Sequence, residues 1–156
     1  VELVEKKDRI EDAVCATKAA IEEGIVPGGG SVYIRALESL NNLNSDNPDI
    51  KTGINIIKNA LTYPIKQICT NAGVSGDVVI DKIIYHTALE SLHNSDRVYV
   101  EELDNYGYNA KIESFGNLIK MGVIDPAKAV RVALENAASV AGLFLTTECV
   151  IVDDME

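Results

Sequence analysis

The chain has 156 residues and a mass of 16.8 kDa, which suits one compact domain or one domain with a short appendage. Its 14 Lys and Arg residues against 24 Asp and Glu residues give a formal net charge of −10. This excess of acid argues against a nucleic-acid-binding protein, because phosphate-backbone binding needs clustered cations. A hydrophobic content of 47% argues against global disorder. No apolar run approaches the roughly 18 residues of a membrane span, so we expect no membrane partner.

The soft metal ligands of the chain are scattered. Cys15, Cys69 and Cys149 are far apart, and His86 and His93 are the histidines. The sequence has no CxxC or HxxxH spacing, so we expect no structural zinc site and no other metal site built by this chain alone. Widely spaced thiols are typical of small buried side chains in a reducing compartment.

The first half of the chain predicts helices. Residues 5–23 carry apolar side chains at helical spacing, and Gly24 is predicted to cap this helix in a left-handed conformation. A glycine run at 28–30 precedes a second helix, and the polar tract at 41–49 predicts a loop. A third helix is expected to end at Gly73, with a kink, or a break between two abutting helices, at Pro64.

The segments that follow are mixed. A fourth helix is expected after Asp77, fading towards Asn94, and residues 97–100 alternate as a strand does. The NYGYNA segment at 105–110 is interpreted as a turn within a hairpin. A short helix that carries Phe115 is expected to end at Gly122.

The C-terminal segments predict a long helix and an edge strand. Asp125 is predicted to be the N-cap and Pro126 the first residue of a helix at 126–145. This helix is apolar almost all round, which predicts a place in the middle of a bundle. Residues 148–152 are rich in β-branched side chains and predict an edge strand that seeks a partner. The fold class is therefore mainly α, a helical bundle with a small β-hairpin and a C-terminal strand.

Taken singly, the polar motifs leave alternatives open. Glycines at the start of a helix let an anion approach free N–H groups, but this run matches neither GxxxxGK[ST] nor GxGxxG, so a flexible hinge between helices is the favoured explanation of the run taken alone. Asp12 lies among charges on the polar side of its helix, so a solvated carboxylate is the default interpretation of this residue taken alone. Helix capping alone accounts for Asp125, and a turn accounts for Asn109.

The order of the motifs indicates a family. EDAVCATKAAIEEGIVPGGG, NAG, NYGYNA, MGVIDPAKAVRVALENAASVAG and LTTECVIVD follow one another along residues 1–153. In wording, spacing and order they resemble the C-terminal part of group I chaperonins, the GroEL-type ATP-dependent protein-folding machines. The resemblance implies a bundle of the chaperonin equatorial-domain type. It assigns residues 1–23 to the C-terminal segment of the intermediate domain, and 24–156 to the C-terminal half of the equatorial, ATP-binding domain.

The same resemblance implies roles for particular residues. Gly28, Gly29 and Gly30 would lie against the nucleotide, with Gly29 in direct contact. Asp12 would be the catalytic carboxylate, which swings in to position the attacking water.

The adenosine end of the nucleotide has its own set of implied residues. Asn109 and Ala110 would border the adenine, and Val123 would line the base. Asp125 would take the ribose hydroxyls.

The sequence also departs from the family pattern. It contains neither the GDGTTT-type phosphate loop, with the Asp that holds magnesium, nor the apical domain. We therefore expect an excised fragment that carries half of a site for ATP or ADP with Mg²⁺ and is inactive as an enzyme alone. In the intact protein the partners implied are unfolded client proteins, a co-chaperonin lid and identical subunits in heptameric rings.

An insertion around residues 82–104, relative to bacterial members, favours the mitochondrial matrix or a plastid, with the bacterial cytoplasm as the alternative. The competing function is a helical interaction module without nucleotide chemistry. ATP-dependent thermal stabilisation would separate the two.

Overall fold

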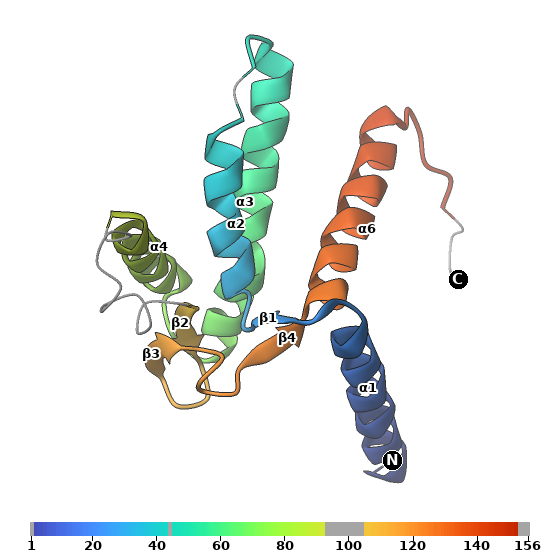
Figure 1. Cartoon of the computed structure of the whole chain (residues 1–156). Coiled ribbons are helices and arrows are strands. Elements are labelled where there is room, and N and C mark those ends of the chain that lie inside the picture. The colour runs from blue at the N-terminus through green and yellow to red at the C-terminus, as the bar shows by residue number, and fades with distance from the viewer. Residues whose placement is uncertain (1, 44, 93–104, 153–156) are drawn as a thin grey trace. The chain divides into compact units, whose positions relative to one another are not determined.

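The computed structural model describes residues 2–43, 45–92 and 105–152. The elements, in chain order, are α1 (Glu2–Glu23), β1 (Ile25–Pro27), α2 (Ser31–Asn41), α3 (Pro48–Asn71), α4 (Gly76–Leu92), β2 (Tyr106–Asn109), β3 (Ser114–Asn117), β4 (Ile124–Pro126) and α6 (Ala127–Thr146) (Figure 1). The mainly helical fold class is confirmed. By internal contacts the chain separates into two compact units, residues 25–125 and residues 1–24 with 126–156. The predicted division between intermediate and equatorial domains stays a prediction.

The unit of residues 25–125 has the main core. Helix α3 contacts both α2 and α4, and β2 contacts α4 and α2; α2 and α3 run side by side in Figure 1. The buried cluster joins all of these elements through Ile34, Ile65, Cys69, Val79, Ile80, Ile83 and Tyr108. Within α3 and α4 these residues recur at helical spacing, so one stripe of each helix faces the core. The second, third and fourth predicted helices are confirmed as α2, α3 and α4.

Helix α3 begins at Pro48, inside the tract at 41–49 that was predicted as a loop, and ends at Asn71, two residues before the predicted end at Gly73. Pro48 occupies its first turn, and the side chain of Asn47 accepts a hydrogen bond of 2.8 Å from the backbone N–H of Asp49. Pro64 lies inside the helix, which is one element to Asn71, so the alternative of two abutting helices is wrong. Proline leaves a helical carbonyl without a donor, and here Pro64 and Ala60 are both exposed, where water can satisfy that carbonyl.

The β2–β3 hairpin differs from two predictions, the turn at 105–110 and the short helix around Phe115. The NYGYNA segment forms strand β2 itself, which pairs antiparallel with β3, so that Tyr108 lies opposite Phe115 and Asn109 opposite Ser114. Phe115 is therefore in a strand, and the short helix predicted around it is wrong. The rings of Tyr108 and Phe115 have centroids 5.0 Å apart. This cross-strand aromatic contact stabilises the hairpin at a segment whose apolar spacing also suited a helix. Residues 97–100, predicted as a strand, lie outside the described residues.

A short strand precedes α6 at the position where the sequence predicted the start of the helix. Residues 124–126 form β4, which pairs with β1, and α6 begins only at Ala127 with Pro126 as its N-cap residue. Asp125 is thus a strand residue and not the predicted N-cap. Its backbone is already used in the extended pairing with β1, which excludes the helix start at this position.

The second unit consists of α1 and α6, which contact each other. Gly24 ends α1 with φ 84°, and its N–H donates to the carbonyl of Ala20 at 2.9 Å, which confirms the predicted cap. No residue of α1 or α6 is buried, and Leu143 and Phe144 of α6 are 69% and 66% exposed. The expectation that α6 lies in the middle of a bundle is therefore not met by the described residues.

Two further expectations concern the C-terminal part. Residues 147–152 form no strand, so the predicted C-terminal strand is wrong for the residues described. A strand needs a partner for its N–H and C=O groups, and none pairs with this segment among the described residues.

Helix α6 is long and apolar enough to cross a membrane, by length and mean hydropathy alone. The expectation that no apolar segment reaches the length of a membrane span is therefore wrong. Core helices of soluble proteins pass the same test.

Candidate nucleotide site and the junction of the first and last helices

The glycine run forms a tight turn before α2. Gly29 and Gly30 have φ of 65° and 76°, left-handed values that favour glycine. A Cβ on Gly30 would lie 2.9 Å from the backbone N of Ile65 in α3, so only glycine lets the turn pack this closely. The N–H of Gly28 donates to the carbonyl of Val123 at 2.9 Å. The run is therefore a packed turn with defined partners, and the flexible-hinge interpretation does not describe it.

Ser31, which the sequence analysis missed, closes this turn. It is fully buried, and its hydroxyl donates to the carbonyl of Gly28 at 2.8 Å. The N–H groups of Ser31 and Tyr33 also donate back into the turn, to Gly28 and Gly30 at 3.3 Å each. The hydroxyl proton of Ser31 is thus used inside the turn. A serine directly after a glycine run, at the start of a helix, was the available signal.

The turn faces the end of β2 and the segment before β4. A Cβ on Gly29 would lie 3.6 Å from the carbonyl O of Tyr108 and 4.0 Å from Cγ1 of Val123. Asn109, the next residue of β2, is 9% exposed, and its Oδ1 accepts a hydrogen bond of 3.0 Å from the N–H of Lys111. Ala110 follows at the turn and is half-buried. The fold thus brings the glycine turn, the end of β2 and Val123 together.

Asp125 follows Ile124, whose backbone N and C lie 3.2 Å from where a Cβ on Gly28 would be. Asp125 is half-buried in β4, two residues after Val123. The pKa of the Tyr33 phenol is raised, chiefly by burial and secondly by the negative charge of Asp125, so the two side chains are electrostatic neighbours. Asp125 therefore belongs to the same region as the glycine turn. Tyr33, which that region also contains, was not among the predicted site residues.

The remaining predicted site residue lies in the other unit. Asp12 is an exposed residue of α1, and its catalytic role stays a prediction.

A groove of about 470 Å³ lies between α2, α3 and α4, in the same unit as the glycine turn. Its lining includes Ile34, Lys58 and Ile84 and none of the predicted nucleotide-site residues. The candidate site therefore rests on backbone approach at the glycine turn and not on this groove.

The sequence and the fold of the chain both match known proteins. A sequence model of the TCP-1/cpn60 chaperonin family matches residues 1–155. The chain belongs to the TCP-1/cpn60 chaperonin family. It is similar to the crystal structure of a group III chaperonin in the open state, with a TM-score of 0.73 and 26% sequence identity. That match covers 96% of this chain and 28% of the other chain, so the chain spans just over a quarter of that chaperonin. The narrower assignment to group I stays a prediction.

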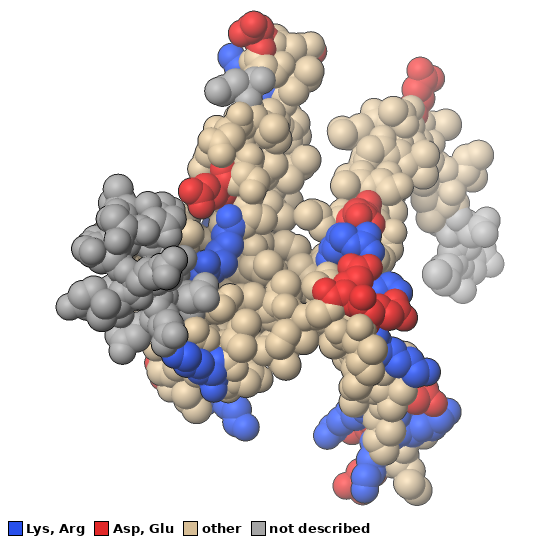
Figure 2. Space-filling view, in the orientation of Figure 1, with Lys and Arg blue, Asp and Glu red and all other residues tan. Residues whose placement is uncertain are grey.

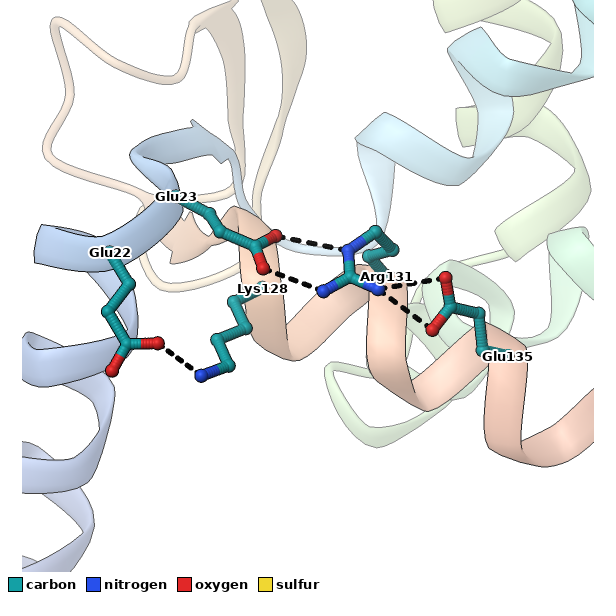
Figure 3. A network of polar contacts seen from close by, with 5 residues as sticks. All are labelled: Glu22, Glu23, Lys128, Arg131 and Glu135. Carbon is teal, nitrogen blue, oxygen red and sulfur yellow. Dashed lines mark hydrogen bonds and ion pairs between the residues drawn. The ribbon is translucent and has the colours of Figure 1, made fainter.

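In this chaperonin chain, ion pairs connect α1 to α6 within their unit (Figure 3). Arg131 of α6 donates from Nε and Nη2 to the two carboxylate oxygens of Glu23 in α1, at 3.0 and 2.6 Å. Its Nη1 donates to both oxygens of Glu135 at 2.8 Å. Lys128 pairs with Glu22 beside them. Figure 2 shows charged side chains gathered where these helices meet. The acidic pair before Gly24, with cations at i and i+3 in α6, was a signal that the sequence analysis did not use.

The ion pair predicts a pH dependence for this unit. The hydrogen bonds from Arg131 lower the pKa of the Glu23 carboxyl below its ordinary value of 4.5. The ion pair is therefore complete above pH 4.5 and is lost as the pH falls through the lowered pKa. A carboxyl NMR titration should give a midpoint below 4.5, and Arg131→Gln should move that midpoint upward. A midpoint that Arg131→Gln leaves in place would contradict the assignment.

Proposed function

We propose that this chain is part of an ATP-dependent protein-folding chaperonin of group I, and that residues 25–125 form the adenosine side of its nucleotide site. Family membership supports the general function, and one observation supports the site. The glycine turn at 28–30, the end of β2 and residues 123–125 come from distant parts of the sequence, and the fold brings them together in one unit.

The residues of this region suit an adenine nucleotide. The half-exposed backbone at Gly29 has no side chain to hold a ligand away. Asn109 and Ala110 would border the adenine, Val123 would supply an apolar contact to the base, and the Asp125 carboxylate would accept hydrogen bonds from the ribose hydroxyls. Each proposed role matches the chemistry of its side chain.

Hydrolysis would depend on groups beyond this unit. Phosphoryl transfer relies on positioning and on neutralising charge, and Mg²⁺ supplies part of that neutralisation when bound with ATP or ADP. We assign the phosphate loop and the magnesium ligand to other segments of the longer protein. Asp12 on α1 would orient the attacking water, and Gly24 at the end of α1 would be the pivot.

The wider biology is part of the same proposal. The intact protein would act in heptameric rings of identical subunits, on unfolded client proteins, with a co-chaperonin lid. The insertion around residues 82–104 favours the mitochondrial matrix or a plastid.

The test is nucleotide-dependent stabilisation of the longer protein that includes the N-terminal segment of the family. A ligand that binds only the folded state raises its stability by about 2.7 kcal/mol at 100 times Kd. We expect ATP to raise the melting temperature, Asp125→Ala to reduce this shift strongly, and Asp81→Ala, an exposed carboxylate of α4, to leave it unchanged. No shift at saturating ATP would favour the alternative, an interaction module without nucleotide chemistry.

A further inference from the structure

Arg131 is held by carboxylates of two different helices. Glu23 of α1 accepts from Nε and Nη2, and Glu135 of α6 accepts from Nη1 (Figure 3). The two carboxylates use different N–H groups, so both pairs exist at once. Glu135 lies four residues after Arg131 on the same helix, whereas Glu23 is 108 residues away in sequence. One partner of Arg131 thus belongs to its own helix, and the other belongs to α1.

The charges at this junction do not balance. Two cations, Lys128 and Arg131, face three carboxylates, Glu22, Glu23 and Glu135. The side chains of Arg131 and Glu135 are 49% and 59% exposed, so water screens their interaction and its effect is moderate. The negative charge of Glu135 offsets part of the attraction that Arg131 exerts on Glu23. It also keeps the guanidinium paired if Glu23 departs.

We propose that Glu135 is a positioning residue that weakens the hold of Arg131 on α1, so that α1 can separate from α6 at low cost. Its relevance to hydrolysis rests on the proposed function, because α1 carries Asp12. The competing role has the opposite sign. If Glu135 served mainly to fix the orientation of Arg131 for Glu23, its removal would loosen α1 instead of tightening it.

Whether Glu135 weakens or strengthens the contact between α1 and α6 can be measured on this chain without nucleotide. Spin labels at Cys15 in α1 and at Val140→Cys in α6, both exposed positions, report the distance between the two helices. Cys149→Ser removes the other exposed thiol, and Cys69 is buried. The distance distribution from pulsed electron paramagnetic resonance gives the fraction of molecules in which α1 has left α6.

We expect Glu135→Gln to lower the separated fraction about two- to fivefold, the range of a partly exposed ion pair. Glu23→Gln should raise it, and Glu11→Gln, which removes a carboxylate paired with Lys7 within α1, should leave it unchanged. In an Arg131→Gln background the effect of Glu135→Gln should vanish, because it acts through the guanidinium.

A separated fraction that Glu135→Gln raises or leaves unchanged overturns the proposal. Because the measurement uses no ATP, failure of the nucleotide site would appear in the thermal-shift test and not here.

Discussion

Replacing Asp12 by Ala in the full-length chaperonin is expected to lower the rate of ATP hydrolysis by about 100-fold or more, the usual contribution of a positioned acid–base group. Nucleotide binding should be nearly unchanged, because the residues proposed to contact adenosine lie in the unit of residues 25–125, whereas Asp12 is on α1. The loss should therefore appear in kcat, with little change in KM. Steady-state hydrolysis with a parallel measurement of ATP affinity checks both parts.

Asp8→Ala provides the matched control. Asp8 is also an exposed aspartate of α1, one helical turn earlier, so its removal changes the net charge of the helix equally. Its turnover should remain close to that of the unmodified protein. Unchanged turnover in Asp12→Ala would remove Asp12 from the proposed role, and equal losses in both variants would point to the charge of α1 as a whole.

The second large effect concerns stability and can be measured on this chain. Gly107→Ala in β2 is expected to lower the free energy of unfolding by about 3 kcal/mol, at the upper end of overpacking effects. The added Cβ would lie 2.4 Å from Cδ1 of Leu118, 2.9 Å from its Cγ and 3.2 Å from Cβ of Ser31. Leu118 and Ser31 are both fully buried, so neither has free space to move into. The hairpin or α2 would have to shift.

Gly53→Ala is the corresponding control. Gly53 lies inside α3, and a Cβ there would meet nothing within 4 Å. Alanine favours a helix over glycine by about 1 kcal/mol, so this variant should be as stable as the parent or more stable. Urea denaturation of the parent chain, Gly107→Ala and Gly53→Ala measures the free energy of unfolding of each. A Gly107→Ala chain as stable as the parent would show that the contact between β2 and Leu118 is looser than described.

The helices were largely predictable because local rules determine them. Apolar residues at helical spacing located α2, α3 and α4, and the glycine after Glu23 gave the correct end of α1. The glycine run was correctly singled out as unusual, since several glycines before a helix require a reason. That reason, the close approach to Ile65 in α3, involves a residue far away in sequence and became visible only in the fold.

The hairpin region was not predictable from spacing alone. Phe115 and Leu118 are three residues apart, as in a helix, yet Phe115 is a strand residue because Tyr108 lies opposite it. Asp125 and Pro126 match the start of a helix, yet they pair with β1 and delay the helix to Ala127. In both places a partner distant in sequence supplies hydrogen bonds or ring contacts that outweigh a local preference.

For the candidate site, the residue types and their order along the sequence were sufficient to predict the chaperonin family, and the nucleotide roles of the residues stay a prediction. Only the tertiary structure placed the glycine turn beside Tyr108, Val123 and the backbone of Ile124, and only it joined Glu23 to Arg131. The physical reason is how far apart in the sequence the interacting residues are. Helix spacing and caps depend on neighbours within a few residues, which the sequence displays directly, whereas ion pairs and backbone contacts between distant segments exist only once the chain has folded.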